Sequence, residues 1–268
     1  MSKVLPPHRS YLFVPGDRAD RFAKASGSDA DEIILDLEDA VLPHAKADAR
    51  EHVQRWLDQS GSGLVRINGA DTPWFDDDVQ MVSAFEKPVV LPKATQRALA
   101  ALDDRLPENV GVVALVESVA GIKELDVIAS HRRVLRLIFG SVDFASESGI
   151  TAVAETAAVR ADIVLSSIYR GLPPPIDGVS LAIRDEQALA ADVAVSRAAG
   201  FGAKLALHPA QIAAINGGFS PSDDERSWAR EVMDRAAATS FGAFVVQGKL
   251  VDRPVIDRAS RILAQART

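Results

Sequence analysis

The sequence predicts an α/β protein, a TIM or (β/α)8 barrel followed by a C-terminal lid or arm. Short apolar, β-branched runs alternate with Ala-rich stretches of helical periodicity, which is typical of βαβ units in a parallel sheet. Eight such runs can be distinguished, and eight strands close this type of barrel. An open doubly wound sheet alternates in the same way and is the alternative architecture.

Each expected strand is a short run bounded by turn-forming or polar residues. In chain order these runs are Ser10–Val14, Glu32–Asp36, Gly63–Ile67, Pro88–Leu91, Gly111–Val116, Leu135–Phe139, Ile176–Val179 and Lys204–Leu207. Helical periodicity is clearest at Ala45–Leu57, Val119–Ala129, Glu155–Tyr169 and Glu186–Ala199.

The residues after the eighth run follow a different pattern. The turn residues Asn216-Gly217-Gly218 precede an expected helix from Asp223 to about Ala238, an extended segment or hairpin over Phe241–Leu250, and a last helix that ends at about Gln265. This part is too long for a tail and too short for a core of its own. We therefore expect residues 1–215 to form the barrel that carries the active site, and residues 216–268 to form a lid or an intersubunit arm.

Composition excludes several classes of protein. The 268 residues include no cysteine, which rules out disulfides, cysteine zinc sites, iron–sulfur clusters and thiol nucleophiles. The net charge of −7 argues against nucleic acid as the main partner. No apolar run approaches the ~20 residues that span a bilayer, and the N-terminus lacks the pattern of a signal peptide. We expect a soluble, cytoplasmic protein with neither a membrane nor a nucleic-acid partner.

Polar side chains follow the expected strands at their carboxyl ends, where the active site of a barrel lies. These groups are Gly16-Asp17-Arg18, Asp36-Leu37-Glu38-Asp39, Arg66, Lys93, Glu117, Asp143, Asp177 and His208. The opposite ends of the strands carry no such set. The sequence therefore predicts an active site at the mouth of the barrel.

Glu117 and Asp143 are candidate metal ligands. Glu117-Ser118 and Asp143 each stand where a helix begins, so each is also compatible with helix capping. Together, at the ends of adjacent strands, two carboxylates without a nearby Cys or paired His suit Mg²⁺ or Mn²⁺ with water in the remaining positions.

Arg66 lies within an apolar strand, where a guanidinium needs an anionic partner. It can form a structural ion pair with Glu38 or Asp39, or it can bind a substrate carboxylate or enolate; the ring of charges at the strand ends favours the second. In Asp36-Leu37-Glu38-Asp39, at least one carboxylate is expected to be structural, and the others can hold metal-bound waters or orient Arg66.

Three further residues allow two interpretations each. Lys93 can form a Schiff base, as in a metal-free aldolase, or pair with a carboxylate. His208 is interpreted as a structural hydrogen-bonding residue beside Pro209, because no second His accompanies it. Asp252, ahead of Pro254, can cap the last helix or act as an acid/base delivered by a lid; the residues alone favour the cap.

The chain resembles the β subunit of citrate lyase and its stand-alone relatives, in the HpcH/HpaI aldolase superfamily. The matching stretches occur in family order over nearly the whole chain. They are Arg9–Arg18, Ile33–Val41 with Lys46 and Arg50, Val65–Asn68, Leu91–Lys93, Ala114–Ser118, Phe139–Phe144, Ile176–Gly178, Gly200–Gln211 and Phe244–Pro254.

The resemblance implies a TIM barrel that is trimeric or built from trimers and acts on CoA or acyl-carrier thioesters of hydroxy acids. It implies Glu117 and Asp143 as Mg²⁺ ligands and Arg66 as the substrate-binding arginine. It makes Asp252 a residue that a neighbouring subunit supplies to the site. This differs from the helix-capping interpretation that the residues alone favour. Arg18 and Lys46, near the first two loops, become candidates for binding CoA.

We therefore expect a Mg²⁺-dependent carbon–carbon lyase. Its substrate would be a 3-hydroxyacyl-CoA thioester of the malyl-, citramalyl- or citryl-CoA type, and its products acetyl-CoA and a 2-keto acid. The metal lowers the pKa of the substrate hydroxyl, Arg66 stabilises the developing charge, and Asp252 protonates the enolate in a homotrimer or hexamer. Glu117, Glu38 and Asp39 join Arg66 as substrate-binding candidates.

Alternatives remain at this point. The chain could act on a carrier-bound citryl group as a subunit of a citrate lyase complex, be a class I aldolase that uses Lys93, or be a non-catalytic barrel. Three departures from the family pattern bear on substrate preference: Val142 where many relatives are acidic, the helix entry Ala145–Ser148, and Ala206-Leu207.

Overall fold

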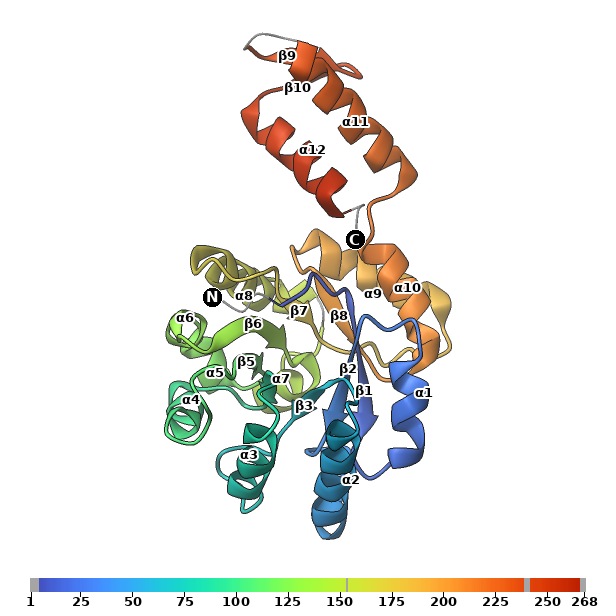
Figure 1. The fold of residues 1–268 in the computed structure, drawn as a ribbon. Helices are drawn as coiled ribbons and strands as arrows, with labels where there is room; N and C mark the ends of the chain where they lie inside the picture. Colours follow the sequence, from blue (N-terminus) through green and yellow to red (C-terminus); the bar gives the residue numbers. More distant parts are fainter. Residues whose placement is uncertain (1–4, 153, 239–241, 266–268) are drawn as a thin grey trace. The chain divides into compact units, whose positions relative to one another are not determined.

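The computed structural model describes residues 5–152, 154–238 and 242–265. Its parallel strands form a closed barrel in sequential order, with the helices around the outside (Figure 1). The barrel closes where Ser10, Tyr11 and Leu12 of the first strand pair with residues 204–206 of the eighth. The strands are β1 Ser10–Pro15, β2 Glu32–Asp36, β3 Leu64–Arg66, β4 Val89–Leu91, β5 Val112–Val116, β6 Val134–Phe139, β7 Ile176–Asp177 and β8 Ala203–Ala206. The (β/α)8 prediction is confirmed, and the open sheet is excluded.

Every strand contributes to a core inside the barrel, so the barrel is packed rather than hollow. Most of these side chains are β-branched or leucine, as the apolar runs predicted. The buried cluster consists of Tyr11, Ile34, Leu64, Val90, Val113, Leu115, Ile138, Ile176, Ala203 and Leu205.

The barrel helices follow the strands in alternation. They are α1 Phe22–Ser26, α2 Lys46–Asp58, α3 Phe75–Ser83, α4 Gln96–Asp103, α5 Val119–Lys123, α6 Leu125–Ser130, α7 Ser141–Ser148, α8 Ala157–Tyr169, α9 Glu186–Ala198 and α10 Ile212–Phe219. The single helix expected over Val119–Ala129 is divided in two at Glu124, whose ψ of 10° departs from the helix. The Glu124 carboxylate there accepts a 2.7 Å hydrogen bond from the backbone amide of Gln96 in α4.

Asp177 does not belong to the mouth of the barrel, and its inclusion among the strand-end polar groups is wrong. Its side chain is completely buried. It accepts hydrogen bonds from Arg160 of α8 (2.9 Å), from Lys204 of β8 (3.0 Å) and from Ser196 of α9. Burial opposes ionisation of Asp177, but Lys204 and Arg160 outweigh it and hold the pKa of this carboxyl below its ordinary value. The cluster joins the sheet to its helices.

The chain divides between Ile215 and Asn216. In the second part, α11 (Asp223–Ala238), α12 (Arg253–Gln265) and a hairpin of β9 (Phe244–Val246) and β10 (Lys249–Val251) are built around their own small apolar cluster. The expectation that this part is too short for a core of its own is therefore wrong. Gln247 and Gly248 at the hairpin turn both have positive φ, 48° and 74°, as a type I′ turn requires. The expected extended segment is thus a hairpin. None of the helices in the described ranges is both long and apolar enough to span a membrane.

We predict that Asp177→Asn lowers the free energy of unfolding by about 3–5 kcal/mol, because it leaves Arg160 and Lys204 buried without a counter-charge. The matched control is Asp126→Asn, which removes the carboxylate of an exposed pair with Arg170 and should cost less than about 1 kcal/mol. Urea denaturation of both variants measures the difference. Equal losses would contradict the structural role of the buried cluster.

Candidate active site

A cavity of about 380 Å³ opens at the carboxyl ends of the strands. Its wall has two halves of different chemistry, which we call the polar arc and the apolar arc. The polar arc consists of Asp36, Asp39, Arg66, Glu117 and Asp143, and the apolar arc consists of Phe13, Pro15, Val179, Leu181, Leu205 and Leu207. The structure therefore brings together the two predicted metal ligands and the predicted substrate arginine.

Arg66 is held by three carboxylates from the β2 end. Asp36 binds it in bidentate geometry, with Nε–Oδ1 at 2.7 Å and Nη2–Oδ2 at 2.6 Å. Nη1 lies 2.9 Å from Glu38 Oε2 and 3.6 Å from Asp39 Oδ2. The guanidinium also stacks over the Phe13 ring at 4.7 Å. Burial opposes its charge, but Asp36 outweighs it and the pKa of Arg66 is raised, so Arg66 is a permanent cation in a fixed place.

Asp36 as the main partner of Arg66 was not identified from the sequence, which pointed to Glu38 or Asp39. Its carboxylate also accepts hydrogen bonds from the backbone amides of Glu38 (2.9 Å) and Ala40 (3.3 Å), so it is the structural carboxylate expected among the three. The pairing follows from the strand register, which places Asp36 opposite Arg66 on adjacent parallel strands.

Lys46 lies behind this loop rather than in the cavity. Its Nζ donates hydrogen bonds of 2.7 Å each to the carbonyls of Leu37 and Glu38 and to Asn68 Oδ1. These three bonds use all three protons of the ammonium group, and the side chain is buried. Lys46 therefore has no donor left for a CoA phosphate, and its assignment to CoA binding does not fit the structure; it fixes the β2 loop instead.

Glu117 is almost completely buried at the end of β5. Its Oε1 accepts a 2.8 Å hydrogen bond from the backbone amide of Lys93, which has a left-handed φ of 47°. Ser118, not Glu117, caps α5, so the capping interpretation of Glu117 does not hold. Gly140 makes room for it, since a Cβ there would lie 2.3 Å from the Cβ of Glu117. The sequence alone gave no sign of this requirement at Gly140.

Asp143 lies in the first turn of α7, exposed to the cavity. Burial, and next the charge of Glu38, raise the pKa of Glu117 to about 8, and Asp143 contributes in the same direction. Burial likewise raises the pKa of Glu38 to about 7, against the opposing charge of Arg66. The site thus contains too little positive charge to balance its carboxylates.

This environment fits a divalent cation. Glu117 and Asp143 offer hard oxygen ligands, and Mg²⁺ is commonly held by one or two carboxylates with water and substrate completing its coordination. Glu38 Oε2 lies 2.9 Å from Arg66 Nη1, whereas Glu117 and Asp143 form no ion pair with any residue of the described ranges. In the described ranges no group of three or more Asp, Glu, His or Cys side chains is arranged to bind a metal.

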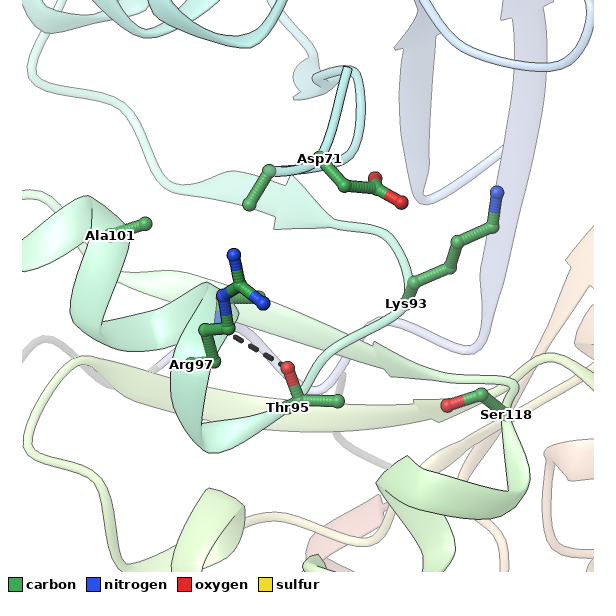
Figure 2. Close-up of a pocket in the computed structure, with 8 residues that line it drawn as sticks. Asp71, Lys93, Thr95, Arg97, Ala101 and Ser118 are labelled. Carbon is green, nitrogen blue, oxygen red and sulfur yellow. Dashed lines mark hydrogen bonds between the residues drawn. The ribbon is translucent and has the colours of Figure 1, made fainter.

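Lys93 is half-exposed, with its Nζ 3.6 Å from Glu38 Oε1. Burial lowers its pKa, but Glu38, Asp39 and Glu117 outweigh burial, and the pKa is raised above its ordinary value. A Schiff-base lysine must lose its proton, so this environment opposes the class I aldolase alternative. Lys93 lines a second cavity of about 370 Å³, shown with Asp71 and Arg97 in Figure 2.

Arg18 and His208 are not among the residues that line the cavity, and Asp252 belongs to the second part of the chain. Arg18 forms a partly exposed pair with Asp20 at 3.0 Å, so it stays accessible to an anionic ligand. His208 accepts a 3.1 Å hydrogen bond from the Ala210 amide and caps a short helix, in agreement with its structural interpretation. Asp252, in the second part of the chain, is exposed, and its Oδ1 accepts a 3.4 Å hydrogen bond from the Val255 amide at the start of α12.

Comparisons with known proteins agree with this architecture. The family model for HpcH/HpaI aldolase/citrate lyase matches residues 9–209. A (3S)-malyl-CoA thioesterase of Cereibacter sphaeroides is 34% identical over 99% of this chain and 97% of its own. The L-malyl-CoA/β-methylmalyl-CoA lyase of the same species is 33% identical over 97% and 95%. A crystal structure of Mycobacterium tuberculosis CitE in complex with magnesium, acetoacetate and coenzyme A superposes with a TM-score of 0.86, at 31% identity over 97% and 98% of the two chains.

The match of the family model extends across the barrel, and the relatives align over nearly the full length of both sequences. The chain belongs to the HpcH/HpaI aldolase/citrate lyase family, as a CitE-like member.

Proposed function

We propose that this protein is a Mg²⁺-dependent lyase that cleaves a 3-hydroxyacyl-CoA thioester into acetyl-CoA and a 2-keto acid. The observation that carries the proposal is the convergence of Glu117, Asp143 and a rigidly held Arg66 on one cavity at the barrel mouth. Relatives named for malyl-CoA chemistry, and a structural neighbour that holds magnesium and coenzyme A, support it.

Glu117 and Asp143 would hold the metal, because they are the carboxylates of the polar arc that are not engaged with Arg66. When bound there, a divalent cation lowers the pKa of the substrate hydroxyl whose deprotonation begins carbon–carbon cleavage. Arg66 stabilises the negative charge that develops on oxygen, an effect worth about 3 kcal/mol for a well-placed donor. Asp36 and Phe13 fix the guanidinium beforehand, so little reorganisation is needed during the reaction.

The enolate of acetyl-CoA must be protonated, and we assign this step to Asp252 of a neighbouring subunit in a homotrimer or hexamer. Asp252 is exposed, and its hydrogen bond to the Val255 amide leaves its other carboxylate oxygen available. Arg18 binds the anionic part of CoA near the first loop. Glu38 and Asp39 orient Arg66 and the waters around the metal.

The first prediction of this function concerns product and metal dependence. Incubation with malyl-CoA or citramalyl-CoA and Mg²⁺ should release acetyl-CoA and a keto acid in equal amounts, and EDTA should abolish the release. Glu117→Gln and Asp143→Asn should each lower kcat/KM by more than about 100-fold, because even residues behind a metal ligand contribute about 10–100-fold. Asp126→Asn, on the exposed side of α6, is the control and should leave the rate unchanged.

Mass spectrometry of the products separates the alternatives. Free CoA with intact malate would identify a thioesterase and contradict the lyase. Cleavage only of a carrier-bound citryl group would identify a citrate lyase subunit. EDTA-resistant cleavage with a borohydride-trapped adduct on Lys93 would identify a class I aldolase.

A second prediction concerns stability without metal. The pKa of Glu117 in the folded protein, about 8, lies above its ordinary 4.5, so the folded state loses stability as the pH rises from about 4.5 to about 8. Glu117→Gln removes this buried charge and still accepts the Lys93 hydrogen bond. In EDTA at pH 8 we expect a higher Tm, by about 2–4 °C for each kcal/mol recovered, and no gain near pH 4.

Glu51→Gln, exposed on α2, provides the control for loss of one negative charge and should melt like the wild type at both pH values. If Glu117→Gln melts at or below the wild-type Tm at pH 8, the carboxylate is not destabilising and the charge imbalance proposed for the site is wrong.

A third prediction concerns Asp252. Asp252→Asn should lower kcat by about 10²–10⁴-fold, the usual contribution of a general acid, while binding of the thioester persists. Asp257→Asn, in the helix α12 that follows Asp252, should have no effect. Mixing Asp252→Asn with an inactive Arg66→Lys variant should restore activity once subunits exchange. Absence of recovery, with exchange shown by native mass spectrometry, would refute a site shared between subunits.

A further inference from the structure

We infer that Lys93 is a positioning residue, whose left-handed backbone leaves Glu117 only one oxygen atom, Oε2, for a divalent cation. This role rests on the proposed function, because it concerns the metal site of that function. It belongs to the main chain of Lys93 and not to its ammonium group. Its consequence is discrimination against Ca²⁺, a cation that commonly binds a carboxylate through both oxygens.

The backbone of Lys93 is in an unusual conformation. Its φ of 47° lies in the left-handed region, where a non-glycine residue persists only if its surroundings hold it there. Three other non-glycine residues of the described ranges have a positive φ, namely Ser60, Glu86 and Gln247, and none of them lines either of the two cavities described above. In the part of the chain that the structure describes, Lys93 is therefore the residue of this kind that lies beside the candidate site.

The chain is fixed on both sides of Lys93. Before it, β4 is paired with β5. After it, the amide of Ala94 donates a 2.9 Å hydrogen bond to the carbonyl of Leu115 in β5. Between these two anchors, the amide of Lys93 donates its 2.8 Å hydrogen bond to Glu117 Oε1. The left-handed residue thus forms a rigid link between the loop after β4 and this carboxylate.

The two oxygens of Glu117 are consequently in different situations. Oε1 is engaged by the amide of Lys93, and this is the hydrogen bond that the described residues make to the carboxylate. Oε2 lies beside Gly140, where a Cβ would be 2.7 Å away from it. Gly140 directly precedes α7, which carries Asp143 in its first turn. Oε2 is therefore the free oxygen, on the side of the second candidate metal ligand.

The ammonium group of Lys93 has a different partner. Nζ lies 3.6 Å from Glu38 Oε1, and the side chain is half-exposed. Figure 2 shows this side chain extending away from Ser118, the residue that follows Glu117. Because the main chain and the side chain of Lys93 contact different carboxylates, substitutions can separate their effects.

A carboxylate with one engaged oxygen distinguishes between cations. Mg²⁺ demands near-ideal octahedral geometry and keeps several waters, so one oxygen from each of two carboxylates is sufficient. Ca²⁺ takes about six to eight oxygen ligands and often uses both oxygens of a carboxylate. To do so at Glu117, it would have to displace the amide of Lys93 from Oε1 and leave a backbone donor without a partner. The contact therefore disfavours Ca²⁺ relative to Mg²⁺.

Calorimetric titration of the metal-free protein with Mg²⁺ and with Ca²⁺ tests the inference without any turnover. Lys93→Asn and Lys93→Val both remove the ammonium group, but Asn tolerates a left-handed backbone and Val does not. We expect Lys93→Val to bind Mg²⁺ about 10–100-fold more weakly than Lys93→Asn, the range for groups that orient a metal ligand. Ca²⁺ depends less on the fixed carboxylate, so the preference for Mg²⁺ over Ca²⁺ should fall by about 10-fold in Lys93→Val.

Ser60→Val is the control for backbone strain alone. Ser60 is exposed, has a φ of 65° and lines neither cavity. Its substitution should lower the Tm and leave both cation affinities unchanged. Equal Mg²⁺ affinities of the two Lys93 variants, or parallel losses of Mg²⁺ and Ca²⁺ affinity, would overturn the inference and leave the lyase proposal intact. Absence of Mg²⁺ binding by the wild type would overturn both.

Hydrogen exchange of the Lys93 amide in the wild-type protein provides a second measurement, which decides the matter if Lys93→Val does not fold. The hydrogen bond to Oε1 should persist when Oε2 binds the cation. In saturating Mg²⁺ we therefore expect this amide, followed by NMR, to exchange no faster than in the metal-free protein. Faster exchange would show that Oε1 leaves the amide when the cation binds, and would overturn the inference.

Discussion

The bidentate ion pair between Arg66 and Asp36 is the interaction on which the site depends. The two residues occupy paired positions on β2 and β3, and both are almost completely buried. Neither charge could be buried alone, because an unpaired ion in the interior costs several kcal/mol. Their pairing determines where the guanidinium lies, and the same Asp36 carboxylate shapes the loop that carries Glu38 and Asp39. Lys46 anchors this loop from behind through three hydrogen bonds.

The surplus of carboxylates around this pair lowers the stability of the folded protein and favours the binding of a cation. Burial and mutual repulsion raise the pKa values of Glu38 and Glu117 to about 7 and 8, so in the absence of a cation these groups resist ionisation. A divalent ion stabilises such a site more than it would stabilise one whose carboxylates are already neutralised, since metal binding and deprotonation are coupled. Gly140 shows that the backbone is adapted to the same end, because any side chain there would displace Glu117.

Much of the barrel could be predicted because its elements repeat one simple pattern. β2 and α11 were predicted with the bounds that the structure shows, since both are continuous apolar or amphipathic runs between clear turn signals. β7 is shorter than expected and ends at Asp177, and the charge on that strand faces Lys204 and Arg160 and not the mouth. The direction in which a strand-end residue points depends on neighbouring elements that a single run does not reveal.

For the site, the residues that could be predicted are those marked by position alone: Glu117 and Asp143 at strand ends, and Arg66 within an apolar run. The roles of Lys46 and Gly140 depend on contacts between separate loops, which no local pattern encodes.

The contrast between the two arcs also bears on how one family can include both lyases and thioesterases. A thioesterase and a lyase resemble this chain to nearly the same degree, so overall similarity does not distinguish the two reactions. Hydrolysis needs a water molecule oriented and deprotonated beside the thioester carbonyl. The side chains of β7, β8 and β1 that line the cavity are hydrocarbon and can do neither. A hydrolase would have to activate water from the polar arc, where Asp36 and Asp39 face Arg66 and the remaining pair is suited to a cation. Cleavage of the carbon–carbon bond needs no activated water; it would use Arg66 and the two candidate metal ligands of the polar arc, with the proposed Asp252 of a neighbouring subunit as the acid.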